Sequence, residues 1–161
     1  MTTLYHGSLE IVATPEIRKP NRTLDYGEGF YLTSSADQAE AWVRRKLKGD
    51  ITLGYVNIYE YDENMEAAFE TLAFERPDEA WLDFVMANRM NLNYRHGYDI
   101  VKGPVANDRV YASFALYEAR LIGKQELINE LREYKLVNQI LIHTDRALAS
   151  VKWIEAKEVK I

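Results

Sequence analysis

The segment ITLGYVNIYEYD, which begins at residue 51, alternates between two sets of side chains. Successive side chains of an extended strand point to opposite faces of a sheet. One face would carry Tyr55, Asn57, Tyr59 and Tyr61, and the other Val56, Ile58 and Glu60. An alternation of this length does not fit the period of a helix, which is 3.6 residues. The chain therefore has to build a β-sheet around this segment.

Shorter apolar or alternating runs predict further strands near residues 3–6, 29–33, 98–102, 108–112, 137–142 and 151–160. Helical spacing predicts helices over 35–48, after Pro77, and over about 124–134. Strands and helices do not alternate regularly, as they would in a doubly wound parallel sheet. The sequence therefore predicts an α+β fold with a mainly antiparallel sheet.

Each predicted helix carries an apolar stripe, which we interpret as core rather than as a ligand groove. Ser35 and Gln38 fit a capping box at the start of the first helix, and Pro77 suits the first turn of the second. The stripes are Ala39, Trp42, Val43 and Leu47; then Trp81, Phe84, Val85 and Asn88; then Leu127, Ile128, Leu131 and Tyr134.

Composition limits the class of protein. With 161 residues and no linker-like or repeated segment, residues 1–161 are expected to form one domain. The chain has no cysteine, no signal-peptide pattern and no apolar run long enough for a bilayer, so we expect a cytoplasmic protein without a membrane partner. The net charge of -5 does not favour nucleic acid as a partner.

One basic run departs from this acidic balance: Arg44, Arg45, Lys46 and Lys48, near the end of the first predicted helix. The simpler interpretation is a solvated face that complements the helix dipole. The alternative is a contact for a phosphate or an acidic partner.

Several familiar sites are absent from the sequence. The pair Gly27 and Gly29 lacks the third glycine and the βαβ context of a dinucleotide fingerprint, and there is no P-loop or G-x-S-x-G elbow. His6, His96 and His143 are far apart and follow no metal-ligand spacing, so no metal site is expected.

Polar residues inside strand-like runs are more informative. His6 and Gly7 end the run LYHGS, Tyr31 lies in GEGFYLT, and Gln139 opens QILIHT. In this order they resemble the three-part strand pattern of the ADP-ribosyltransferase superfamily, on its histidine–tyrosine–glutamate branch. The closest similarity is to small bacterial proteins, some encoded in toxin–antitoxin-like operons. It runs through LYHGS, GEGFYLT…QAEAW, WLDFVMANR, YDIVKGPVANDRVY and QILIHTDRAL, and so covers most of the chain.

The resemblance implies a fold of mainly antiparallel, split sheets flanked by helices, with a cleft that binds NAD as the donor of ADP-ribose. It implies that His6 hydrogen-bonds the adenosine ribose, that Gly7 offers unobstructed backbone groups, and that Tyr31 stacks on the nicotinamide ring. Gly27 and Gly29 would then let the chain turn tightly before Tyr31.

Gln139 departs from the pattern, because the active transferases usually carry glutamate there. Glutamine keeps a hydrogen bond but cannot stabilise a developing cation by charge. Asp108 is our first candidate to supply that charge, and Asp99 the second. Both also have structural interpretations, Asp108 as a turn or cap residue and Asp99 as a partner of Arg95 or Arg109.

Two functions therefore stay open. The first is an NAD-dependent transferase that modifies an unknown macromolecule in the bacterial cytoplasm, or as a delivered toxin, and that is held by an antitoxin-like protein. The second is a catalytically silent module that keeps the pocket and binds a nucleotide or a protein.

Overall fold

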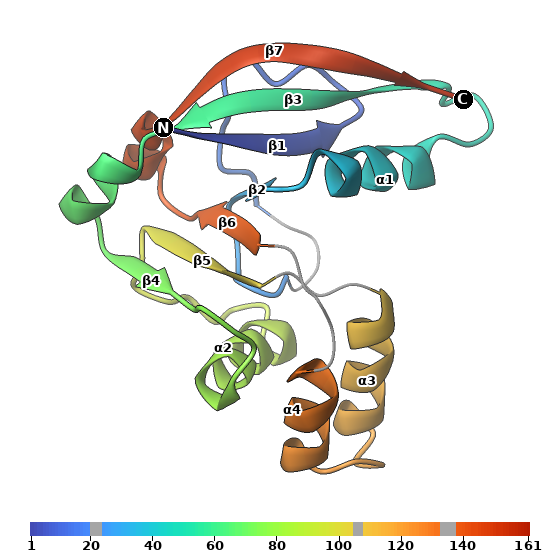
Figure 1. Ribbon diagram of the computed structural model, residues 1–161, viewed down its shortest axis with the longest axis vertical. Helices are drawn as coiled ribbons and strands as arrows, with labels where there is room; N and C mark the ends of the chain where they lie inside the picture. The colour runs from blue at the N-terminus through green and yellow to red at the C-terminus, as the bar shows by residue number, and fades with distance from the viewer. Residues whose placement is uncertain (20–23, 105–107, 133–137) are drawn as a thin grey trace.

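The computed structural model describes residues 1–19, 24–104, 108–132 and 138–161, and for residues 108–111 the backbone alone (Figure 1). Within these ranges seven strands form one sheet in the order β4-β5-β6-β2-β1-β3-β7. The strands are β1 (Thr2–Ser8), β2 (Phe30–Thr33), β3 (Leu53–Tyr61), β4 (Thr71–Ala73), β5 (Ile100–Pro104), β6 (Asn138–Ile142) and β7 (Val151–Lys160). Only β4 and β5 pair in parallel. The predicted α+β class with a mainly antiparallel sheet is confirmed.

The split sheets that the resemblance implies are one sheet in hydrogen bonding, because β1 and β2 join both groups of strands. The join is narrow. In the described chain, β1 and β2 are in register at the single pair Tyr5↔Thr33, whereas β1 pairs with β3 along its whole length. Figure 1 shows β1, β3 and β7 turning away from β2, β6, β5 and β4. The sheet is therefore continuous in hydrogen bonding but divides into two half-sheets at β1 and β2.

Four α-helices and two 3₁₀ helices complete the described fold. They are α1 (Ala36–Lys46), α2 (Glu79–Met90), α3 (Asp108–Glu118), α4 (Lys124–Arg132), η1 (Glu63–Ala68) and η2 (Asp145–Ser150). The strand predicted at 108–112 is wrong, because α3 begins there. Phe114 and Tyr117 pack against one core cluster, and their spacing of three residues belongs to a helix.

The strand register assigns the core residues to two faces. Tyr31 and Leu141 lie opposite each other and pack with α2, α3 and α4, whereas Phe30 and Ile142 face the other side and pack with Tyr59. Tyr5 lies opposite Thr33, on the same face as Tyr31, and it packs under α1. Helix α1 and the group α2–α4 therefore cover different parts of one sheet face.

Local sequence explains the ends and the packing of α1. The side chain of Ser35 accepts a hydrogen bond from the Gln38 backbone N–H at 3.1 Å, as in a capping box, but the Gln38 side chain binds the Thr33 hydroxyl instead of closing the box. A Cβ on Gly7 would lie 2.5 Å from the carbonyl oxygen of Ala39. Glycine at this position therefore lets α1 lie directly on β1.

The other two predicted helices bury most of their expected stripes. Helix α2 buries Trp81, Val85 and Asn88, and α4 buries Leu127, Ile128 and Leu131, whereas Tyr134 lies outside the described residues. Pro77 precedes the N-cap residue Asp78 and so lies before the first turn, not within it. The short strand β4 was not predicted, because three residues are too few to show a period.

Candidate functional site

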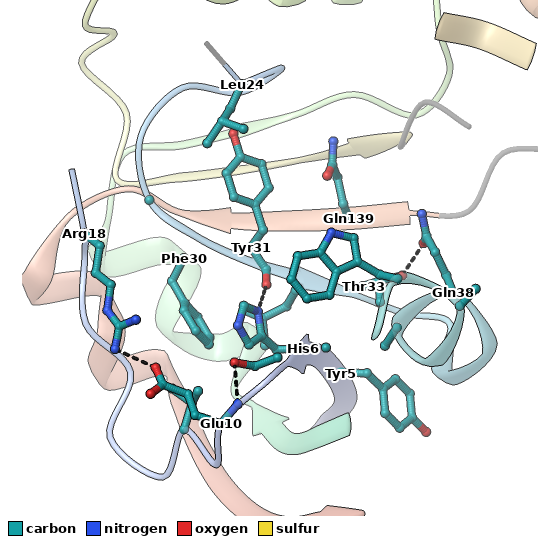
Figure 2. Close-up of a pocket in the computed structure, with 18 of the residues that line it drawn as sticks. Tyr5, His6, Glu10, Arg18, Leu24, Phe30, Tyr31, Thr33, Gln38 and Gln139 are labelled. Carbon is teal, nitrogen blue, oxygen red and sulfur yellow. Dashed lines mark hydrogen bonds and ion pairs between the residues drawn. The ribbon is translucent and has the colours of Figure 1, made fainter. Parts of the chain in front are cut away.

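A cavity of about 570 Å³ lies beside α1, β1 and β2, and its lining includes residues from both sheet faces, such as Tyr31 and Phe30. Its walls come from β1, β2, β6, α1, the loop that follows β1 and the loop that precedes β2 (Figure 2). This volume lies within the range of sites for small molecules and cofactors. The cavity lies at the narrow join of the two half-sheets.

Four of the residues singled out in the sequence line this cavity. His6 and Gly7 come from β1, Tyr31 from β2 and Gln139 from β6. Tyr31 and Gln139 share one face, since Tyr31 lies opposite Leu141 and Gln139 opposite Thr33. Figure 2 shows their side chains next to each other. The fold therefore gathers residues that are up to 133 positions apart in the chain.

The two aspartates proposed as substitutes for the missing glutamate differ in outcome. Asp108 begins α3, but its side chain lies outside the described residues. Asp99 is not among the residues that line the cavity. It binds Arg146 and Thr144, which with a hydrogen bond from the Glu70 backbone hold the pKa of its carboxyl well below the usual range.

The expectation that Arg95 pairs with Asp99 is wrong. Arg95 pairs with Glu28 at 3.4 Å, and the side chain of Arg109 lies outside the described residues. Asp99 is therefore a structural residue that ties η2 to the start of β5.

His6 stands where the ladder between β1 and β2 ends. Its Nδ1 lies 2.7 Å from the carbonyl oxygen of Tyr31, and its ring packs on Phe30 at a centroid distance of 4.3 Å. A carbonyl only accepts, so Nδ1 carries the proton. Burial lowers the pKa of His6, so the ring is neutral at pH 7 and Nε2 is an acceptor. Among the described residues Nε2 has no hydrogen-bond partner.

Tyr31 is fixed by the glycine-containing turn that precedes it. Its hydroxyl accepts a hydrogen bond from the Tyr26 backbone N–H at 3.1 Å and donates to the carbonyl oxygen of Gly27. Gly27 and Gly29 have φ values of 85° and 155°, which disfavour any other residue. A Cβ on Gly29 would also collide with the carbonyl oxygen of Ile142. The two glycines therefore close a turn around the tip of Tyr31.

Helix α1 contributes a wall of the cavity, and of this wall the sequence analysis had named only Arg45 as a candidate ligand contact, within the basic run. Gln38, Trp42 and Arg45, spaced by four and three residues, all line it. Trp42 was predicted as core, but 36% of it is exposed. A signal was present in the sequence, because an aromatic residue between a polar and a charged one at helical spacing marks a face that is not purely core.

The loop after β1 places charged groups at the cavity. Arg18 pairs with Glu10 at 2.8 Å and with Glu16 at 3.1 Å, and all three line it. Asp25, from the loop before β2, is buried and pairs with Arg89 at 3.2 Å. The lining of the cavity therefore carries both positive and negative side chains.

His96 and His143, which are distant in the sequence, lie next to each other beside the turn before β2. The rings of His96 and His143 are 4.0 Å apart. His96 Nε2 donates to the carbonyl oxygen of Tyr26, and His143 Nδ1 donates to that of Glu28. In the part of the chain that the structure describes, no three His, Cys, Asp or Glu side chains gather as metal ligands would.

A family model described as "Protein of unknown function (DUF3990)" matches residues 2–153. The chain belongs to the DUF3990 family. The match includes every strand and helix that contributes to the cavity, from β1 to β6. No curated protein matches this DUF3990 chain.

Among the helices of the described ranges, none combines the length and the apolar character needed to span a bilayer.

Proposed function

We propose that this DUF3990 protein binds NAD in the cavity and transfers the ADP-ribose group to a macromolecular acceptor. The observation that carries the proposal is the convergence of His6, Gly7, Tyr31 and Gln139 on one cavity of about 570 Å³. These are the residues to which the resemblance assigns roles in an ADP-ribosyltransferase.

The walls of the cavity suit the parts of NAD. Tyr31 and Trp42 supply aromatic surface for the flat nicotinamide ring. His6 Nε2 is an acceptor that suits a ribose hydroxyl. Arg45, on α1, brings a positive charge to the cavity that suits a diphosphate, whereas the charge of Arg18 is offset by Glu10 and Glu16.

In the proposed reaction the bond between nicotinamide and ribose breaks, and nicotinamide leaves with the bonding electron pair. The ribose passes through an oxocarbenium-like state, and an acceptor nucleophile then bonds to its anomeric carbon and loses a proton. A carboxylate would stabilise that cation. Gln139 carries no charge, so we assign this role to Asp108, as expected from the sequence.

A second candidate function is favoured by Gln139 itself. The residue is buried on β6 and is an amide where the resemblance expects a carboxylate. A module that binds NAD or a related nucleotide without cleaving it would need no charge there. In either case the resemblance makes a bacterial cytoplasmic protein, and a toxin held by an antitoxin-like partner, part of the proposal.

One experiment distinguishes the two candidate functions. The protein is incubated with NAD labelled in its ADP-ribose part, together with bacterial proteins or nucleic acids as acceptors, and binding is measured in parallel by calorimetry. Label retained on a macromolecule supports transfer, and binding without turnover supports the silent module. Release of free ADP-ribose alone contradicts both. Undetectable binding at millimolar NAD overturns the assignment of the cavity.

A further inference from the structure

The hydroxyl of Tyr26 lies over strand β5, close to Gln139 on the neighbouring strand β6. A Cβ on Gly103 would lie 2.5 Å from the Tyr26 hydroxyl, and Gly103 is the cross-strand neighbour of Gln139 in the β5–β6 ladder. The hydroxyl of Tyr26 therefore lies over the sheet beside the Gln139 side chain. Tyr26 is fully buried, and Gln139 is 6% exposed.

The hydroxyl of Tyr26 has three polar neighbours. It donates to the carbonyl oxygen of Pro104 at 2.7 Å and accepts from the indole N–H of Trp81 at 2.8 Å. The side chain of Gln139, across the β5–β6 ladder from Gly103, lies close enough to the hydroxyl to act on the pKa of Tyr26 as a hydrogen-bond partner. A phenolic hydroxyl has one proton to donate, and that proton is used on Pro104. A hydrogen bond between the two side chains is therefore one that the Gln139 amide N–H donates to the Tyr26 oxygen.

This arrangement fixes which end of the amide faces the ligand. An amide nitrogen that donates to Tyr26 leaves the amide oxygen for the cavity. In Figure 2 the amide nitrogen forms the tip of the side chain and the oxygen lies on the Tyr31 side. A glutamate here has no proton to donate when ionised, and it would meet the lone pairs of the Tyr26 oxygen.

We propose that Tyr26 is a positioning residue that holds Gln139 so that the cavity presents an uncharged hydrogen-bond acceptor, which selects a ligand group with a proton to donate. In NAD this group is either the carboxamide N–H of nicotinamide or a hydroxyl of the adjoining ribose. The choice of ligand rests on the proposed function, whereas the hydrogen bond between Tyr26 and Gln139 does not.

The hydrogen bond is tested without any ligand, by a double-mutant cycle on the free energy of unfolding. The variants are Tyr26→Phe, Gln139→Leu and the double variant. If the two side chains are bonded, the double variant loses clearly less than the sum of the two single losses. Additive losses overturn the inference. Tyr61→Phe is a matched control, because its buried hydroxyl binds Glu66 and not Gln139, and combined with Gln139→Leu it should be additive.

The selection is tested by calorimetry with three ligands: NAD, its analogue with a carboxylate in place of the carboxamide, and its analogue with a deoxyribose beside nicotinamide. In the wild type and in Tyr61→Phe, one analogue should bind at least about tenfold more weakly than NAD, and that analogue identifies the donor group. In Tyr26→Phe the amide is free to rotate, so this discrimination should largely disappear while NAD still binds.

Other outcomes overturn the proposal in different ways. A uniform loss of affinity for all three ligands in Tyr26→Phe shows a merely structural role for Tyr26. Equal wild-type affinity for all three ligands excludes selection at Gln139. If the wild type binds none of them, the proposed function and the ligand selection both fail, and the double-mutant cycle alone decides whether Tyr26 positions Gln139.

Discussion

At the scale of single residues, the site depends on side chains that take over contacts normally made by the backbone. His6 reaches the Tyr31 carbonyl at the place where the ladder between β1 and β2 stops. Tyr31 in turn binds the backbone of the preceding turn at Tyr26 and Gly27. Each residue therefore supports the walls of the cavity as well as lining it, and a substitution there changes both stability and binding.

Tyr31 allows these two effects to be separated. Tyr31→Phe keeps the ring but leaves the Tyr26 N–H and the Gly27 carbonyl without their partner, so we expect a loss of stability of about 1 kcal/mol or more. Tyr31→Ala also removes a stacking surface worth about 1–3 kcal/mol, so NAD affinity should fall by about tenfold or more beyond that of Tyr31→Phe. Chemical denaturation and calorimetry measure the two effects, with the exposed Tyr94→Phe as control. Equal affinities for the two Tyr31 variants would exclude stacking.

Gln139→Glu is expected to make stability depend on pH. When ionised, the introduced carboxylate is buried and faces the Tyr26 oxygen, so its pKa in the folded protein should lie above the unfolded value near 4.3. The stability of the variant should then be highest at acid pH and fall as the pH rises through that raised pKa. Melting temperatures at pH 5 and pH 8 measure this, with the exposed Gln125→Glu as control. If Gln139→Glu melts at the same temperature as the wild type at both pH 5 and pH 8, the inferred hydrogen bond between Tyr26 and Gln139 is contradicted.

At the scale of elements, α1 and β1 approach each other closely because β1 carries a glycine where they meet. Gly7→Ala would place a methyl group 2.5 Å from the Ala39 carbonyl oxygen, so α1 must move away from the sheet. We expect a destabilisation of about 1–3 kcal/mol and weaker NAD binding, since α1 carries Trp42 and Arg45. Gly123→Ala, which meets nothing within 4 Å, should be nearly neutral in the same denaturation experiment. If Gly7→Ala leaves the stability and the NAD affinity unchanged, α1 is able to shift away from the sheet without a loss of free energy.

The elements also show what the sequence could and could not predict. Strands with clear alternation, such as β3, and helices with a cap and an apolar stripe, such as α1, were predicted close to their observed bounds. Helix α3 was mistaken for a strand because a short apolar run fits both periods.

For the site, the strand residues could be chosen from the sequence because polar side chains are unusual inside strand-like runs. The contribution of α1 to the cavity and the role of Tyr26 could not be predicted from the sequence. They depend on how a helix is oriented over the sheet and on a contact between β6 and a distant turn.

At the scale of the whole molecule, two buried groups make the fold sensitive to acid in different ranges of pH. Burial, reinforced by His143, lowers the pKa of His96 to about 4. Arg146 holds the pKa of Asp99 well below its usual value, and the two residues tie η2 to β5. Protonation of either group favours the unfolded chain.

We therefore expect the free energy of unfolding to fall as the pH falls from about 6.5 to 4, because unfolded His96 binds its proton first. The stability contributed by Asp99 is present above about pH 4 and is lost only below it. Urea titrations between pH 7 and pH 3 measure both ranges. His96→Gln should have a shallower slope in the upper range, where His6 also contributes, and an unchanged slope in the lower one. Identical profiles for the variant and the wild type would contradict the assignment.

The narrow join at Tyr5↔Thr33 gives ligand binding a consequence for the cooperativity of unfolding. On one sheet face each half-sheet packs its own helices, but on the other face Tyr59 of β3 packs with Phe30 and Ile142 of the other half-sheet. A ligand in the cavity contacts Gly7 and α1 on one side of the join and Tyr31 and Gln139 on the other. Because it binds only while both sides are folded, it strengthens this coupling between the half-sheets. Occupancy should therefore slow amide exchange far from the cavity, as far as the edge strands β7 and β4.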